Sequence, residues 1–145
     1  MPPPRSPYGL IQEDLWPSEH RILVACMLLN CTTRKAVEKV IPSLFSRYPD
    51  AAALAAADID ELSQLISTLG FKNRRARNLI EMSKNYLCQN WKHARELPGI
   101  GEYAAAAWEI FVRRNIPPEC PKDHALTLWW KWHQNHFAGG EKNGH

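Results

Sequence analysis

The chain has 145 residues, of which 45% are hydrophobic and 23% are charged, and its formal net charge at pH 7 is +3. This length predicts one domain, which excludes both a disulfide-stapled miniprotein and a multidomain assembly. No apolar run approaches the ~20 residues of a membrane span, so we expect a soluble protein. A basic excess this small permits nucleic-acid binding without demanding it, so the positions of the charges matter more than their sum.

The cysteines carry information about the cellular compartment. The chain has four, and no two of them form a CxxC motif. The first ten residues lack both the basic and the apolar region of a signal peptide. We therefore expect reduced thiols in an intracellular protein. The four are Cys26, Cys31, Cys88 and Cys120.

The composition also predicts the fold class. Alanine and leucine together number 31, whereas valine and threonine together number 8. The first pair favours helices and the second favours strands, and no stretch alternates apolar and polar residues for long. The sequence therefore predicts an all-α protein. We expect residues 1–9 to form an irregular N-terminal arm, residues 10–137 the folded domain and residues 138–145 a frayed tail.

The first half of the chain predicts two long helices. Residues 22–29 are apolar on every side, which is typical of a helix buried all round, and we expect this helix at the centre of the fold. Thr32 or Thr33 is then the N-cap of a helix that continues to about Tyr48. Pro42 lies inside that helix, so we expect it to kink or split there.

Three further helices are predicted between residues 51 and 87. A short Ala-rich helix covers residues 51–57, and another begins after the N-cap Asp58 and ends at Gly70, a typical C′ residue. The last of the three covers residues 73–87. Its inward face is expected to consist of Ala76, Leu79, Ile80, Ser83 and Leu87.

Charge changes sign sharply between two neighbouring segments. Residues 50–66 carry four acidic residues and no basic one, whereas residues 71–95 carry seven basic residues and one acidic one. A basic cluster is more often a solvated helix face than a nucleic-acid surface, so this pattern does not decide between the two. The residues that follow it make a nucleic-acid surface the better interpretation.

A glycine-containing turn follows the basic segment directly, in the run Leu97-Pro98-Gly99-Ile100-Gly101. A turn with two such glycines before a helix leaves backbone N–H groups pointing outward, and these groups can bind a phosphate. A plain connection between two helices is the alternative for a short Gly-x-Gly alone. The full run, followed by an Ala-rich helix to about Arg113, is typical of the hairpin in a helix-hairpin-helix motif. It predicts sequence-independent contact with a DNA backbone.

About 20 residues beyond the hairpin, Asp123 precedes a segment with apolar residues at helical spacing. Taken alone, this aspartate is best explained as an N-cap. The order of hairpin, helix, loop and aspartate, however, resembles that of the helix-hairpin-helix-GPD superfamily of DNA glycosylases, in which the aspartate is catalytic. The apolar spacing is set by Leu126, Trp129, Trp130 and His133.

Five ordered matches narrow the resemblance to the glycosylase domains of the methyl-CpG-binding domain protein four type. These domains remove thymine or uracil mispaired with guanine, and the resemblance spans about residues 6–136. It implies two helical lobes with the active-site cleft between them. It also implies a monomer that acts on mismatched or damaged double-stranded DNA in base excision repair and hands its product to an abasic-site endonuclease. The matches are residues 6–13, the turn Leu29-Asn30-x-Thr32, residues 69–71, residues 99–103 and residues 121–124.

The resemblance implies a role for two residues in the chemistry. Asp123 would stabilise an oxocarbenium-like sugar and present a water, and its place at a helix N-terminus favours the ionised form. Bifunctional members carry a nucleophilic lysine two residues past the second hairpin glycine, and here that residue is Tyr103. We therefore expect a monofunctional enzyme with Tyr103 in the base pocket. Lys122 is an alternative nucleophile, and a non-catalytic DNA-binding module is the alternative to an enzyme.

The DNA contacts are also assigned by resemblance. Gln12 would bond the Watson–Crick edge of a flipped pyrimidine, and its alternative is a surface residue. Phe71 would be the wedge that fills the gap in the duplex, and its alternative is a core residue. The base-pocket residues are Leu10, Ile11 and Gln12; the wedge and opposite-strand residues are Phe71, Asn30 and Cys31; and the phosphate contacts are Gly99, Ile100, Gly101, Lys72, Arg75 and Lys122.

The sequence departs from the resembled domains at two positions. Cys31 replaces an arginine and Ala125 replaces a lysine, so the opposite-base preference, any CpG preference and the range of pyrimidines stay open. No cysteine follows Asp123, so we expect no iron–sulfur cluster, no other metal and no cofactor, apart from K⁺ or Na⁺ at the hairpin. A zinc site is the alternative, formed by Cys120, His124, His133 and His136. The expected location is the nucleus in a eukaryote and otherwise the cytoplasm or nucleoid.

Overall fold

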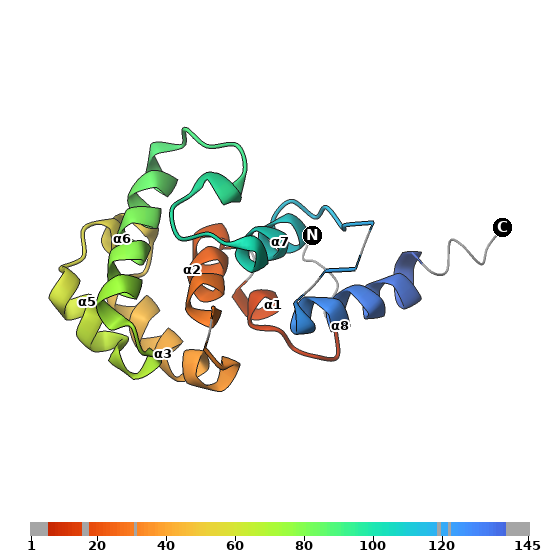
Figure 1. Cartoon of the computed structure of the whole chain (residues 1–145), viewed down its shortest axis with the longest axis horizontal. Helices are drawn as coiled ribbons and strands as arrows, with labels where there is room; N and C mark the ends of the chain where they lie inside the picture. The colour runs from red at the N-terminus through yellow and green to blue at the C-terminus, as the bar shows by residue number, and fades with distance from the viewer. Residues whose placement is uncertain (1–5, 16–17, 31, 119, 122, 139–145) are drawn as a thin grey trace.

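The computed structural model describes residues 6–15, 18–30, 32–118, 120–121 and 123–138, and all regular structure in these ranges is helical (Figure 1). The all-α prediction is therefore confirmed. Within the same ranges, no helix is long and apolar enough to cross a membrane. The α-helices are α1 (Ile11–Leu15), α2 (Glu19–Leu29), α3 (Arg34–Arg47), α4 (Ala51–Ala55), α5 (Ile59–Leu65), α6 (Lys72–Cys88), α7 (Glu102–Phe111) and α8 (His124–His133). Short 3₁₀ helices cover Ser67–Leu69 and Ala94–Glu96, and a π-helical turn covers Gln134–Ala138.

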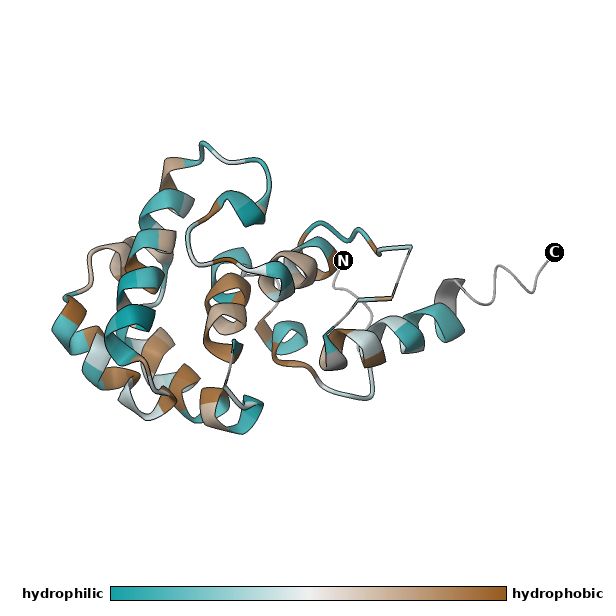
Figure 2. Ribbon diagram, in the orientation of Figure 1, coloured by the Kyte–Doolittle hydropathy of each residue, from teal (hydrophilic) through white to brown (hydrophobic). Residues whose placement is uncertain are grey.

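Helix α2 lies between two groups of helices, with α3, α5 and α6 on one side and α1, α7 and α8 on the other (Figure 1). Ser18 caps its N-terminus, and the serine Oγ accepts from the backbone N–H of Arg21 at 3.3 Å. A helix with a polar face could not be covered from both sides, and α2 is mostly hydrophobic in Figure 2. The predicted central helix is therefore confirmed. Its buried apolar residues are Ile22, Leu23, Val24, Ala25, Cys26 and Leu28.

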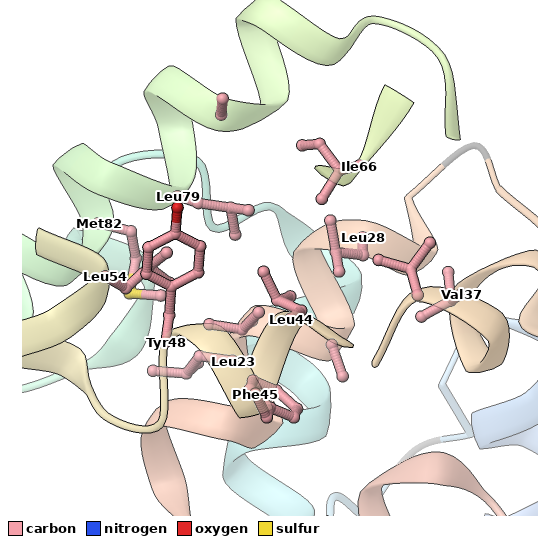
Figure 3. Packing of buried hydrophobic residues seen from close by; sticks show 14 of the residues in the cluster. Leu23, Leu28, Val37, Leu44, Phe45, Tyr48, Leu54, Ile66, Leu79 and Met82 are labelled. Carbon is pink, nitrogen blue, oxygen red and sulfur yellow. The ribbon is translucent and has the colours of Figure 1, made fainter. Parts of the chain in front are cut away.

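The buried side chains form two clusters, and α2 contributes to both. In the larger one, Leu23 and Leu28 of α2 pack with residues of α3, α4 and α6 (Figure 3). In the smaller one, Ile22 and Cys26 pack with apolar residues of α7 and α8, among them Trp129. The molecule therefore has two helical lobes that share α2, as predicted.

Helix α3 begins and continues largely as expected. Thr33 is its N-cap, and the threonine Oγ1 accepts from the backbone N–H of Ala36 at 3.2 Å. The helix runs through Pro42 to Arg47, so Pro42 does not split it, and the expected kink stays a prediction. Proline removes a single backbone donor, and the buried Leu44 beyond it keeps the last turn packed in the core.

Two other boundaries differ from the prediction. Asp58 caps α5 as expected, but α5 ends at Leu65, and Gly70 (φ +79°) closes the 3₁₀ turn that follows instead. Leu87 was expected on the inward face of α6 and is 46% exposed. The fully buried residues of α6 end at Ser83, so its last turn extends past the residues that cover the helix.

Candidate functional site

A cavity of about 340 Å³ opens where the two lobes meet. Its walls come from the start of α1, the end of α2, the first turn of α7 and the loop before α8. These segments lie more than a hundred residues apart in the chain at their extremes. The cavity nevertheless brings together the residues predicted for the base pocket and the chemistry: Leu10, Ile11, Gln12, Tyr103 and Asp123, with Asn30 beside them.

Asp123 is both the N-cap of α8 and part of the cavity wall. Its Oδ2 accepts from the backbone N–H of Leu126 at 3.1 Å, and its carbonyl oxygen accepts from the N–H of Thr127 at 2.8 Å. The N-cap prediction is therefore confirmed. Capping holds the carboxylate in one orientation at the cavity wall, where the helix dipole favours negative charge.

Gln12 is 2% exposed, so the alternative of a surface residue is wrong. Its Nε2 donates to the hydroxyl of Tyr103 and to Sγ of Cys26, the latter at 3.4 Å. A carboxamide has two N–H donors and one carbonyl acceptor. Because both donors are used inside the protein, the amide can offer a ligand in the cavity only its Oε1 acceptor.

The groups bonded to Gln12 are uncharged. Burial raises the pKa of the Cys26 thiol to about 12. Burial also raises the pKa of Tyr103, and the neighbouring Cys26 and Asp123 add to that increase. Both groups keep their protons over the whole physiological range. The carboxylate of Asp123 therefore lies near two neutral hydrogen-bonding groups, the thiol of Cys26 and the hydroxyl of Tyr103.

The burial of Cys26 can be tested directly by alkylation. We expect iodoacetamide at pH 8 to alkylate the exposed Cys88 and Cys120 in the folded protein and to leave Cys26 unmodified, because its thiol is 1% exposed and protonated. Peptide mass spectrometry before and after denaturation measures this. Alkylation of native Cys26 at the rate of Cys88 would contradict the packing described here.

Ser6 and Glu13 fix the chain next to the cavity, and sequence reasoning assigned no role to either. The buried carboxylate of Glu13 accepts from the backbone N–H of Ser6 at 3.1 Å and from its Oγ at 2.6 Å. Arg34, in the cavity wall, donates to the carbonyl oxygen of Tyr8 at 3.2 Å. These bonds hold residues 6–8 against α1 and α3. Ser6 and Glu13 lie at the two ends of residues 6–13, the first of the five sequence matches. A single sequence nevertheless does not show that the carboxylate of Glu13 is buried.

A second cavity, of about 570 Å³, lies beside the first, and Asn30 lines both. Phe71 lies in its wall with 72% of its surface exposed, so the alternative of a core residue is wrong. The hairpin residues Gly99, Ile100 and Gly101 form another wall, and a Cβ atom on Gly99 (φ +80°) would lie 2.8 Å from Cε of Met27. The predicted wedge, the Asn30 turn and the hairpin are therefore neighbours on one face.

The basic residues of this face are not all placed as predicted. Arg74 and Asn78 line the second cavity and were not assigned a site, although Arg74 belongs to the basic segment. Lys72 is exposed at the start of α6. Arg75, predicted as a phosphate contact, is half-buried and donates to backbone carbonyl groups within the protein. Two further predictions, on Cys31 and Lys122, lie outside the described residues.

The hairpin leads into a helix whose first turn has no side-chain cap. Gly101 is the N-cap of α7 and has no side chain to accept from the first N–H groups. Those groups need an acceptor from outside the helix, as a phosphate could provide. This arrangement agrees with the phosphate-binding role predicted for the hairpin, which stays a prediction.

The geometry gives little support to the alternative zinc site. Among the described side chains, no three from His, Cys, Asp and Glu gather closely enough to hold a metal ion. The side chain of His124 lies outside the described part. His133 stacks on Trp129, with ring centroids 5.1 Å apart, which agrees with the expectation that it packs on the apolar face of α8.

Comparison with known proteins agrees with this arrangement. The model of the HhH-GPD superfamily of base excision DNA repair proteins matches residues 24–139. The chain is 39% identical over 130 residues to the Methyl-CpG-binding domain protein 4-like protein of Arabidopsis thaliana, covering 90% of this chain and 29% of that protein. It is 39% identical over 105 residues to the Thymine-DNA glycosylase of Aeropyrum pernix, covering 68% of this chain and 46% of that protein. The solved structure of a thermostable thymine-DNA glycosylase has a TM-score of 0.63 at 25% identity, with 68% of this chain and 49% of that one covered.

The chain thus spans less than half the length of each of these relatives. The family model, by contrast, covers most of this chain, from the middle of α2 to beyond α8. It includes the hairpin and Asp123, the two features on which the sequence resemblance mainly depended. The chain belongs to the HhH-GPD superfamily of base excision DNA repair proteins.

Proposed function

We propose that the chain is a monofunctional DNA glycosylase. It would flip thymine, uracil or a 5-substituted uracil out of the duplex, with guanine as the opposite base, and hydrolyse the N-glycosidic bond to leave an abasic site. One observation carries the proposal: Asp123, held at the N-terminus of α8, shares a cavity with Gln12 and Tyr103. The name of the archaeal relative, Thymine-DNA glycosylase, supports thymine as a substrate.

In this proposal Asp123 performs the chemistry. When the bond between C1′ and the base breaks, its electron pair leaves with the base and positive charge develops on the sugar. The carboxylate stabilises that charge and orients a water, whose oxygen bonds to C1′. The proton released by the water passes to the carboxylate or to the departing base. Oδ2 caps α8, so Oδ1 is the oxygen assigned to the sugar and the water.

Gln12 would select the base. Its Oε1 acceptor complements the N3–H donor of uracil and thymine. The corresponding nitrogen of cytosine is itself an acceptor, so cytosine would place two lone pairs against each other. Turning the amide around to accept cytosine would require the O–H of Tyr103 and the weakly donating S–H of Cys26 to reverse and donate to Oε1.

The DNA-binding face would combine the hairpin, Lys72 and Phe71. Phosphate would lie at the uncapped start of α7, where K⁺ or Na⁺ would join it to the hairpin carbonyl groups. Phe71 would occupy the gap left by the flipped base. We further propose that the protein works as a monomer, in the nucleus of a eukaryote or otherwise in the cytoplasm or nucleoid, and passes its abasic product to an endonuclease.

Excision from a panel of duplexes tests this proposal. The panel contains T:G, U:G, U:A, hydroxymethyluracil and oxoguanine, and alkali converts abasic sites into strand breaks. We expect product from T:G and U:G and none from oxoguanine. The second candidate is a non-catalytic DNA-binding module, which the capping role of Asp123 favours because capping alone would explain that residue. Absence of product from every duplex would support the binder; salt dependence of binding would not distinguish the two.

The absence of strand cleavage is a separate prediction. Tyr103 occupies the position of the lysine in bifunctional members, and a phenol has no amine with which to form a Schiff base at C1′. We expect borohydride to trap no covalent complex with a U:G duplex and the strand to stay intact until alkali is added. A trapped adduct would overturn the monofunctional assignment and point to another nucleophile, with Lys122 as the first to replace.

A further inference from the structure

The side chain of Arg75 joins three segments of the DNA-facing surface. Its Nε donates to the carbonyl oxygen of Gly70 at 2.9 Å. Its Nη1 donates to the carbonyl oxygens of Leu28 and Met27, at 3.1 Å and 3.5 Å, at the end of α2. Its Nη2 donates to the carbonyl oxygen of Asn30 at 2.9 Å and to the hydroxyl of Thr32.

Among the described residues, these five bonds equal in number the five N–H donors of a guanidinium. A positive charge at the end of α2 also complements the carbonyl groups and the dipole of that helix. A phosphate could bond to this side chain only by replacing carbonyl groups that it already holds. The side chain of Arg75 is therefore engaged in contacts within the protein surface.

The backbone of Arg75 holds the same loop. Its N–H donates to the carbonyl oxygen of Phe71 at 2.9 Å. Phe71 has φ 48° and ψ 40°, a left-handed conformation that costs a non-glycine residue about 1–3 kcal/mol and persists only where its surroundings hold it. The backbone bond from Arg75 to Phe71 is the first i→i+4 bond of α6 and does not depend on the side chain, whereas the bond from Nε to the carbonyl oxygen of Gly70 is specific to arginine and fixes the residue directly before Phe71.

We propose that Arg75 is a positioning residue that locks the Phe71 loop and the Asn30 turn into one unit, so that both enter the duplex together when a base is flipped. The inference rests on the proposed function. It predicts that Arg75 matters for a base that must be extracted from a duplex and matters little for a base that is already unstacked. A residue that only stabilised the fold would affect both substrates equally.

Arg75→Lys tests this, because lysine keeps the charge and loses the planar fork that reaches five acceptors. We expect single-turnover excision of uracil from a U:G duplex to fall about 10- to 100-fold, as a misplaced catalytic surface does. Excision from a single-stranded oligonucleotide should change less than about twofold. Arg77→Lys, at an exposed position on the same helix, is the matched control and should change neither rate by more than about twofold.

Two results would overturn the inference. If Arg75→Lys lost activity equally on duplex and single-stranded DNA, Arg75 would act on fold stability alone. If Arg75→Lys excised uracil from the duplex at the wild-type rate, a positive charge at this position would be enough without the guanidinium fork. If Arg75→Lys does not fold, Thr32→Val removes one acceptor of the guanidinium. That variant must then show a smaller loss confined to the duplex, and an unchanged ratio of the two rates would contradict the inference.

Fluorescence of 2-aminopurine placed next to the mismatch separates this inference from the proposed function. The probe brightens when its neighbour is unstacked, whether or not the base is excised. A wild-type chain that brightens the probe without releasing base would refute the glycosylase proposal, and the inference would still require a weaker signal from Arg75→Lys. Binding of duplex by the wild type without any brightening would contradict the inference itself.

Discussion

Asp123→Asn is expected to lower single-turnover excision by about 10²- to 10⁴-fold, the range typical of losing a catalytic acid or base. Asparagine retains a carbonyl oxygen that can accept from Leu126, so α8 keeps its cap and the fold is preserved. The neutral amide cannot stabilise positive charge on the sugar. Rates are measured with enzyme in excess over a U:G duplex, together with the melting temperature and the affinity for the duplex.

Asp58→Asn is the matched control for this substitution. Asp58 caps α5 through the backbone N–H groups of Asp60 and Glu61, far along the chain from the cavity. The same chemical change is therefore made at an N-cap that has no assigned part in the reaction, and excision should stay at the wild-type rate. Equal rates for the wild type and Asp123→Asn would reduce Asp123 to a structural cap and remove the basis of the proposed mechanism.

Phe71→Ala is expected to slow excision from duplex DNA only. Unstacking a base costs a few kcal/mol, and each 1.4 kcal/mol of lost compensation slows the reaction about tenfold. We therefore expect excision from a U:G duplex to fall about tenfold or more. Uracil in a single strand needs no wedge, so that rate should be unchanged. Stability should be unchanged too, because Phe71 is 72% exposed.

Leu87→Ala provides the control for Phe71→Ala. Leu87 is also an exposed apolar residue of the α6 region, at the end of the helix remote from Phe71. Its removal should leave both rates and the melting temperature close to those of the wild type. A loss of single-stranded activity in Phe71→Ala as large as the loss on the duplex would contradict the wedge assignment and place Phe71 in the base pocket instead.

The features that sequence predicted best depend on neighbouring residues. Thr33, Asp58 and Asp123 cap their helices as expected, because an N-cap bonds to a backbone group two or three residues ahead. The central position of α2 followed from its uniform apolar composition. Each of these features depends only on residues close together in the chain, so it can be predicted from a single sequence.

The features that sequence missed depend on contacts between distant segments. The bond from Gln12 to Tyr103 joins residues 91 apart in the chain, and the bonds from Arg75 to the turn at Asn30 join residues 45 apart. Nothing local distinguishes Arg75 from the exposed basic residues around it, so the sequence predicts a phosphate contact for it as it does for Lys72. Its burial and its partners result from the way α6 packs against α2.

The most direct test of the central claim is the release of free base by the wild-type chain. A U:G and a T:G duplex are incubated with excess protein, the free base is quantified by mass spectrometry, and the strand is examined before and after alkali. We predict one equivalent of uracil or thymine and a strand that stays intact until alkali cleaves it. Tight binding of both duplexes with no free base would contradict the assignment of Asp123 and leave a DNA-binding module.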